Sequence, residues 1–279
     1  MAETGLVHPP AAAARRPLST GARFFGAAWV RKLLLLAVLA LAWEVYAIVL
    51  DNPLLVPRFS ATMQAFYASI ADGTLPARGW VSLRILLAGY AAGMLSAAAL
   101  AAFASTTLIG RDLLETLTSM FNPLPAIALL PLAMIWFGLG NGSLVFVLIH
   151  SVLWPVALNT HSGFLSVSNT LRMVGRNYGL SNLRLIGKIL IPAAFPNILS
   201  GLKIGWAFAW RTLIAAELVF GATAGSGGLG WFIYENKNQL EIPNVFAGLF
   251  TVILIGLLVE NLLFRVIENR TVRRWGMQS

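Results

Sequence analysis

Residues 168–192 read SNTLRMVGRNYGLSNLRLIGKILIP, and they form a polar, basic interruption between two long apolar runs. Ser168 or Asn169 can cap a short helix, because both residue types accept hydrogen bonds from the free N–H groups of a first turn. Gly179 stands where a C′ glycine would end that helix. Three apolar residues share one side of the helix at spacings of three and four: Leu171, Val174 and Tyr178.

A second short helix is predicted after Gly179, with Ser181 as its cap. Its apolar face holds Leu183, Ile186 and Leu190, with Leu185 and Ile189 beside them. Pro192 predicts the next boundary, because the residue before a proline disfavours the helical conformation. The segment is therefore expected to form helix, glycine bend and helix, with four basic side chains toward solvent: Arg172, Arg176, Arg184 and Lys188. Such an element suits docking on a cytosolic partner, and it equally suits a solvated loop that obeys the positive-inside rule.

The composition is typical of an integral membrane protein. Of the 279 residues, 58% are hydrophobic and only 11% are charged, whereas soluble domains carry about 25% charged residues. The mean hydropathy is +0.76. The absence of cysteine excludes disulfide bonds and thiolate metal ligands. The formal net charge of +9 favours cytoplasmic loops beside anionic lipid, so the expected partner is the lipid bilayer and not nucleic acid.

Six apolar stretches reach the minimum of roughly 17 residues that a helix needs to cross a bilayer. They are predicted at about Leu33–Leu50, Ser82–Leu108, Leu117–Leu139, Ser143–Thr160, Ala193–Phe220 and Val245–Ile267. The third contains Pro123, Pro125 and Pro131, so we expect it to be kinked or broken. The predicted fold is an all-α membrane protein, with residues 1–30 as a mobile basic arm and residues 31–275 as one transmembrane domain.

The segments between these spans are expected to be short or irregular. A weak amphipathic helix is predicted around Thr62–Ile70, a polar turn at 111–115, a tight turn at 138–142 and a glycine-rich loop at 221–243. Of the 20 Lys and Arg residues, 14 lie on the side of both termini and of residues 168–192, four lie on the opposite side, and Lys203 and Arg211 lie within the fifth span. This bias predicts that both termini are cytoplasmic.

Four charged residues are predicted at membrane depth: Glu44, Arg211, Glu217 and Glu260. Such residues usually face the interior of a helix bundle or water. Arg211 and Glu217 are six residues apart, so on one helix they point about 120° apart and are poor partners for each other. Each can pair with another span, or, together with Trp210, they can line a solute pathway in which Arg211 favours an anionic solute.

Other motifs carry less information. The run at residues 225–230, GSGGLG, is not a phosphate-binding loop, because no Lys-Ser or Lys-Thr follows it and the topology places it outside. His150 and His161 have no acidic residue at metal-binding spacing, so they are expected to be packed or hydrogen-bonded. Gly201 and Gly205 predict a close helix contact, within the chain or between two copies. No catalytic, cofactor or metal-binding residue is predicted.

Residues 168–192 resemble the cytoplasmic coupling loop of ABC-importer permeases. That pattern is Glu-Ala-Ala, three residues, Gly, nine residues, Ile, one residue and Leu-Pro, and here Gly179, Ile189 and Ile191-Pro192 fall at those spacings. Met173-Val174-Gly175 replaces Glu-Ala-Ala. Further stretches resemble the nitrate/sulfonate/taurine branch: NPLPAIALLP at 122–131, WFGLG at 136–140, AAEL at 215–218 and GGLGW at 227–231.

The resemblance covers roughly residues 33–275 and implies a type I importer in a bacterial inner membrane. Two permease copies would sit over two cytosolic ATPase subunits, which bind ATP and Mg, and a periplasmic or tethered binding protein would deliver the solute. The implied ATPase contacts are Met173, Val174, Gly175, Arg176, Tyr178, Gly179 and Pro192. The implied outer gate is Gly227, Gly228, Gly230 and Trp231. The alternatives are an ion-coupled secondary transporter, with Glu44 and Glu217 as ion sites, and a membrane enzyme.

Overall fold

The computed structural model describes residues 28–220 and 227–274, and in these ranges every regular element is helical. Five of the described helices are long and apolar enough to cross a membrane. They are α2 (Ala28–Leu50), α4 (Thr74–Thr106), α7 (Asn141–Ser166), the continuous helix Leu183–Val219 and the continuous helix Ile242–Arg270. Most of the predicted arm at residues 1–30 lies outside the described residues.

A sixth span is broken, as the prolines predicted. It consists of α5 (Leu108–Phe121), the 3-10 turn η1 (Ala126–Leu129) and α6 (Leu130–Phe137), with a bend of 90° at the break. The predicted polar turn at 111–115 is wrong, because these residues lie inside α5, where Arg111 pairs with Glu115 at 2.9 Å. The helix begins early because the Thr107 hydroxyl accepts the Gly110 N–H and caps its first turn.

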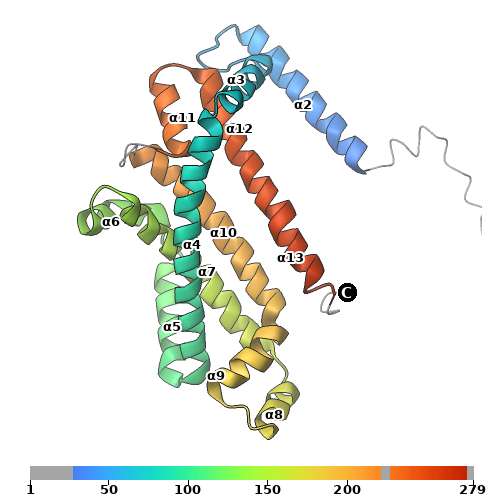
Figure 1. The fold of residues 1–279 in the computed structure, drawn as a ribbon, viewed down its shortest axis with the longest axis vertical. Coiled ribbons are helices and arrows are strands. Elements are labelled where there is room, and N and C mark those ends of the chain that lie inside the picture. The colour runs from blue at the N-terminus through green and yellow to red at the C-terminus, as the bar shows by residue number, and fades with distance from the viewer. Residues whose placement is uncertain (1–27, 221–226, 275–279) are drawn as a thin grey trace, which may run out of the picture.

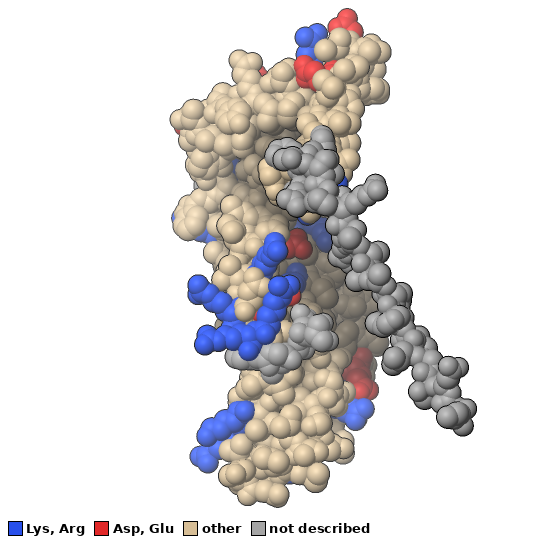
Figure 2. All heavy atoms as spheres, turned by 90° about the vertical axis from the view of Figure 1, so that its right-hand side faces the viewer, with Lys and Arg blue, Asp and Glu red and all other residues tan. Residues whose placement is uncertain are grey.

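The core lies where α4, α7 and α10 (Ile191–Phe220) pack along one another (Figure 1). Gly201 and Gly205 face α7, since a Cβ atom on either would lie within 3.1 Å of Asn159 or Val156. The predicted close contact is therefore made within the chain. Figure 2 shows the Lys and Arg side chains of one face gathered in patches, separated by wide uncharged surface.

The segment 168–192 confirms the predicted helix and glycine bend. The Ser168 hydroxyl accepts the Leu171 N–H at the start of α8 (Asn169–Asn177). Gly179 has φ +72°, a conformation that favours glycine. The Gly179 N–H donates to Arg176 O and the Leu180 N–H to Gly175 O, which is the Schellman arrangement.

The second half of this segment differs from the prediction, because no boundary forms at Pro192. Instead α9 (Asn182–Leu185), the π turn η2 (Ile186–Leu190) and α10 form one helix, Leu183–Val219. The π turn changes the hydrogen-bond register just before Pro192, so the missing proline N–H does not end the helix. Two side chains also differ from the prediction. Leu183 is exposed and does not lie on the buried apolar face. Arg172 donates hydrogen bonds to the carbonyls of Phe164 and Val167 and does not simply face solvent.

The opposite end of the molecule holds two shorter helices, α3 (Phe59–Ala71) and α11 (Leu229–Asn238) (Figure 1). The first confirms the amphipathic helix around 62–70, and Glu44 binds the Ser60 N–H and hydroxyl at its start. The second corrects the predicted loop at 221–243, which is helical over most of its described part. The chain closes with α12 (Ile242–Leu258), the π turn η3 (Val259–Phe264) and α13 (Arg265–Arg270), which Lys203 ties to α10 through Glu268.

Candidate functional site

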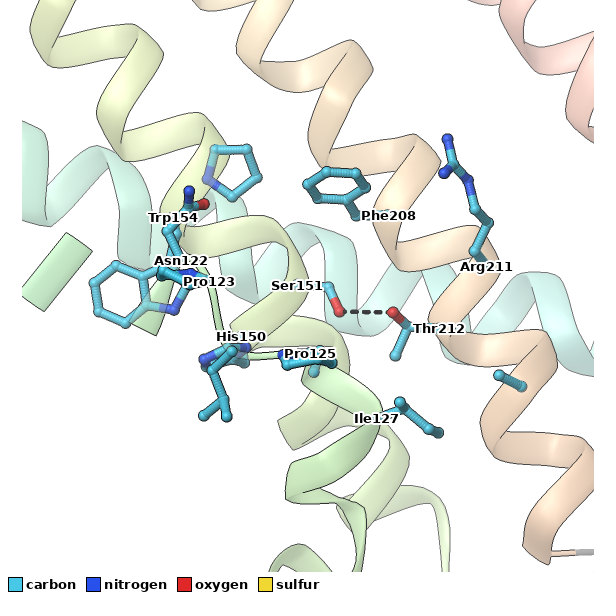
Figure 3. Close-up of a pocket in the computed structure, with 14 residues that line it drawn as sticks. Asn122, Pro123, Pro125, Ile127, His150, Ser151, Trp154, Phe208, Arg211 and Thr212 are labelled. Carbon is cyan, nitrogen blue, oxygen red and sulfur yellow. Dashed lines mark hydrogen bonds between the residues drawn. The ribbon is translucent and has the colours of Figure 1, made fainter. Parts of the chain in front are cut away.

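A cavity of about 390 Å³ lies where the broken span meets α7 and α10 (Figure 3). We call it the break cavity. Its walls include Asn122, Pro123, Pro125 and Ile127 from the break, His150, Ser151 and Trp154 from α7, and Phe208, Arg211 and Thr212 from α10. Irregular backbone at membrane depth is tolerated only where protein covers it or a water-filled cavity faces it, and here the unwound residues 122–125 line this cavity between α7 and α10.

Prolines shape both sides of this cavity. Pro123 and Pro125 have no N–H to donate. The chain between α5 and η1 is therefore held by two turn hydrogen bonds, in which the Leu124 N–H donates to Phe121 O and the Ala128 N–H donates to Pro125 O. Pro155 lies inside α7 and donates no hydrogen bond to the Ser151 carbonyl. Hydroxyl groups of Ser151 and Thr212, 3.1 Å apart, then join α7 to α10 on the cavity wall (Figure 3).

Three aromatic rings stand together at the break. The Trp154 indole stacks on Phe121 with 5.4 Å between centroids and 11° between planes, and His150 meets Trp154 edge-on at 5.9 Å. Trp154 is 7% exposed. Neither the Trp154 indole nitrogen nor the two His150 ring nitrogens has a hydrogen-bond partner within the described residues. His150, which was expected to be packed or hydrogen-bonded, is therefore packed.

Arg211 lies at the rim of the break cavity. Its side chain is exposed, its guanidinium carbon lies 5.8 Å from the Phe208 ring centroid, and in Figure 3 it points away from His150 and Trp154. It has no ion pair with any described residue. Trp210 does not reach this cavity: it is buried, and its indole N–H donates to Val252 O at 3.3 Å. Of the three predicted pathway residues, only Arg211 lines the cavity.

Glu217 belongs to a separate cluster, which we call the Glu217 clamp: Arg78, Ser82, Glu217 and the backbone of residues 227–230. The carboxylate is 3% exposed, and the Ser82 hydroxyl lies 2.8 Å from both of its oxygens. The Gly230 N–H donates to the carboxylate at 2.8 Å, and the Leu229 N–H donates to the Ser82 oxygen at 2.9 Å. The start of α11 is thereby bound to α4 and α10.

Arg78, which lies one turn before Ser82 on α4, also binds α11 and the residues just before it. It donates to Gly227 O at 3.0 Å and pairs with Glu235 at 3.2 Å. The glycines let the backbone come this close, since a Cβ on Gly228 would lie 2.2 Å from the Glu217 carboxylate and one on Gly230 2.6 Å from Ile214 O. Trp231 stacks on Tyr234. The sequence analysis did not identify Arg78 and Ser82. Their only signal in the sequence is a spacing of four residues, which places both side chains on the same side of one helix.

The α8 face is exposed and largely apolar. We define it by Met173, Val174, Arg176, Tyr178 and Gly179, with Met173 57% and Tyr178 82% exposed. Gly175, predicted to belong to this set, is instead buried, and a Cβ there would lie 2.6 Å from Leu185. Pro192 lies on the long helix beyond the bend. The structure thus gathers five of the seven predicted contact residues on one surface.

The comparisons with known proteins all match this chain to membrane components of transport systems. Residues 87–275 match the family described as "Binding-protein-dependent transport system inner membrane component". A putative ABC transporter permease of Methanocaldococcus jannaschii is 30% identical over 86% of this chain and 90% of its own length. A taurine transport system permease of Escherichia coli is 29% identical over 85% and 86%. A nitrate import permease of a Synechocystis strain is 33% identical over 59% and 60%.

Proposed function

Because the chain belongs to the family of binding-protein-dependent transport system inner membrane components, we infer that it forms the pathway by which an importer moves a small anion. The chain is a multi-pass permease subunit of an ABC importer, and membership of this family favours ATP-driven import over an ion-coupled secondary transporter. The solute class, the partners and the orientation are the parts that we propose. The observation that carries the proposal is the exposed apolar α8 face beyond the spans.

The proposed partner at the α8 face is a cytosolic ATPase dimer, which would bind ATP and Mg while this chain binds neither. An exposed apolar patch on one short helix is what a groove on a partner can bury. The patch ends at the αL glycine Gly179, and Arg176 adds a positive charge at its edge. Movement of the ATPase subunits would act on α8 and, through the bend, on the long helix Leu183–Val219.

The proposed solute is a sulfonate-like, nitrate-like or taurine-like anion. The relatives include permeases named for taurine, nitrate and aliphatic sulfonates. In the part of the chain that the structure describes, Arg211 stands at the rim of the break cavity without an ion pair, and no Asp or Glu lines that cavity. A positive rim attracts anions and repels cations.

The proposed orientation places both termini and the α8 face in the cytoplasm of a bacterium, with the chain in the inner membrane. The excess of Lys and Arg on that side supports it. The opposite end, with α3 and α11, would then meet a periplasmic or tethered binding protein. We also propose a second copy of this permease as a partner, the arrangement that the resemblance to type I importers implies.

The variant Gly179→Asp tests the α8 face. We expect solute-stimulated ATP hydrolysis and uptake to fall at least about tenfold at normal membrane abundance, because a charge is placed on the docking surface. The measurement is hydrolysis and uptake by the complete importer, after purification has shown which subunits accompany the permease.

Gly73→Asp is the matched control, because Gly73 also has positive φ (+81°) and open space around it but lies at the other end of the molecule. Both variants place a side chain at positive φ, so backbone strain acts in both, whereas only Gly179→Asp changes the α8 face. Equal activity in both would contradict the assignment of the α8 face. Purification of an active transporter without any nucleotide-hydrolysing subunit would contradict the whole proposal.

A further inference from the structure

A basic groove lies at the end of the molecule that carries α8 and α9 (Figure 1). It consists of three cavities of about 260, 480 and 580 Å³, and the side chain of Arg172 lines all three. We call it the Arg172 groove and define it by Arg111, Arg172, Arg176, the turn at 105–107 and Leu165. Among the described residues, no Asp or Glu lines any of the three cavities. The groove therefore has a surplus of positive charge.

Arg172 is held in place without being neutralised. Its Nε donates to Val167 O at 3.3 Å and its Nη2 donates to Phe164 O, so the end of α7 fixes the guanidinium. Carbonyl oxygens carry no full charge, and Arg172 has no ion pair within the described ranges. The two bonds also leave N–H groups of the guanidinium over for another acceptor. Because a half-buried cation without a counter-charge is costly, an anion in the groove would gain both a charge and fixed donors.

Arg111 brings a second positive charge from α5. It pairs with Glu115 at 2.9 Å, but the two side chains are 51% and 58% exposed, so this pair is weak. Arg111 lines the groove, whereas Glu115 and Asp112 do not. Its guanidinium can therefore exchange Glu115 for another anion at little cost. Arg176 also lines the groove, but it belongs to the α8 face as well, so the inference rests on Arg111 and Arg172.

The position of the groove favours a lipid headgroup over a free ion. α4 ends at Thr106 and α7 ends at Ser166, so the groove lies where two spans leave the membrane. Its lining also includes two exposed apolar side chains, Leu108 and Leu165, which are 81% and 55% exposed. A phosphate ion gains nothing from apolar surface, whereas a phospholipid carries hydrocarbon beside its phosphate. Basic pockets between spans on the cytoplasmic side are suited to anionic headgroups.

We propose that the Arg172 groove binds the phosphate group of an anionic phospholipid from the membrane leaflet on the α8 side. Arg111 and Arg172 would donate to the phosphate oxygens, and Leu108 and Leu165 would contact the start of the acyl chains. Since Arg172 belongs to α8 and also bonds the end of α7, a bound lipid would hold α8 at the membrane surface. The inference requires neither the proposed solute nor the proposed ATPase partner.

The test changes the charge of the groove at exposed positions, where the variants are expected to fold. Arg111→Gln removes a positive charge from the groove, and Glu115→Gln removes the carboxylate that competes for Arg111. Arg184→Gln is the matched control, because Arg184 is an exposed basic residue at the same end of the molecule but does not line the groove. Each variant is purified in detergent with the subunits that accompany it.

Binding of radiolabelled dioleoylphosphatidylglycerol is measured by scintillation proximity. Unlabelled dioleoylphosphatidylcholine, which has the same acyl chains but no net charge, is one competitor. Sodium phosphate is the other, and sodium chloride at the same ionic strength corrects for screening. These two competitors distinguish a charged lipid from any lipid and from a soluble phosphate.

We expect Arg111→Gln to raise the Kd for phosphatidylglycerol about tenfold, as loss of a hydrogen bond to a charged group does. Glu115→Gln should lower this Kd about threefold, because Arg111 no longer has to leave a surface ion pair. Arg184→Gln should leave it unchanged within about twofold, and neither competitor should displace the labelled lipid more than sodium chloride does.

Three results would overturn the inference. An equal loss of affinity in Arg111→Gln and Arg184→Gln would show only a general attraction between basic protein surface and anionic lipid. Displacement by phosphatidylcholine would show that the negative charge of the lipid is not recognised. Displacement by phosphate beyond the effect of sodium chloride would assign the groove to a soluble anion instead of a lipid.

Discussion

The Glu217 clamp and the break cavity both border α10, and the hydrogen bonding of their polar groups is opposite. In the clamp, both carboxylate oxygens and the Ser82 hydroxyl are bonded, and so are the N–H groups of Leu229 and Gly230. In the cavity, the nitrogens of His150 and Trp154 have no partner among the described residues. The satisfied cluster fixes one element to another, whereas the unpaired nitrogens of His150 and Trp154 add no hydrogen bond between elements.

The difference arises from which residues approach each cluster. Glycines bring backbone N–H groups up to Glu217, so the chain itself supplies the donors. His150 and Trp154 instead meet the Phe121 ring, and the prolines that line the same cavity have neither an N–H nor a polar side chain to offer. Helix α10 therefore carries a hydrogen-bonded joint at Glu217, while the unpaired nitrogens of the neighbouring break cavity belong to α7.

Gly230→Ala is expected to have the largest effect on this comparison. The added Cβ would lie 2.6 Å from Ile214 O and 3.1 Å from Leu218 N, and backbone atoms of a long helix cannot move aside. We expect a loss of about 3 kcal/mol in the free energy of unfolding, measured by denaturation in mixed micelles. Gly187→Ala is the control, since nothing lies within 4 Å of its Cβ position. Equal stability of the two variants would mean that α11 is not held against α10.

Glu217→Leu is expected to have an intermediate effect. It removes the acceptor of the Gly230 N–H and the partner of Ser82, which leaves buried polar groups unpaired and costs about 2 kcal/mol of unfolding free energy. Glu217→Gln should lose less, because its amide keeps one acceptor oxygen at the same place. The same denaturation experiment measures both. A Leu variant as stable as the unaltered protein would show that the clamp does not fix α11.

Trp154→Phe is expected to have the smallest effect on stability in the absence of solute. The lost indole N–H has no partner, so only the smaller ring volume counts, and it costs about 1 kcal/mol or less. Trp206→Phe, at another buried indole whose nitrogen has no partner among the described residues, removes the same volume and should lie within about 0.5 kcal/mol of it. A much larger loss for Trp154→Phe would reveal a partner for its nitrogen inside the protein and remove the contrast between the two clusters.

Much of the fold followed from local patterns in the sequence. Apolar length predicted the spans, proline predicted the break after Phe121, and Ser168 and Gly179 marked the ends of α8. These features depend on residues within a few positions of one another. Pairing with another span was one interpretation for Arg211 and Glu217. Glu217 bonds Ser82 of α4, whereas Arg211 has no ion pair with a described residue.

The remainder depends on contacts between distant residues or on unusual turns. Ser82 and Glu217 are 135 positions apart, and no local pattern joins them. Pro192 predicted a boundary, but a π turn, which no simple periodicity reveals, carries the helix past it. The unpaired nitrogens of His150 and Trp154 could not be foreseen either, because a residue type does not tell whether a partner will stand opposite it.

The continuous helix Leu183–Val219 has a mechanical consequence. Its 37 residues span about 55 Å, with the bend beside the α8 face at one end and Glu217 near the other. A rigid rod of that length, tilted by about 10° around its midpoint, would displace its two ends by about 5 Å in opposite directions. Such a tilt would narrow one mouth of a passage as it widens the other, and the residues of this helix that line the break cavity, within 208–215, lie on the Glu217 side of the midpoint.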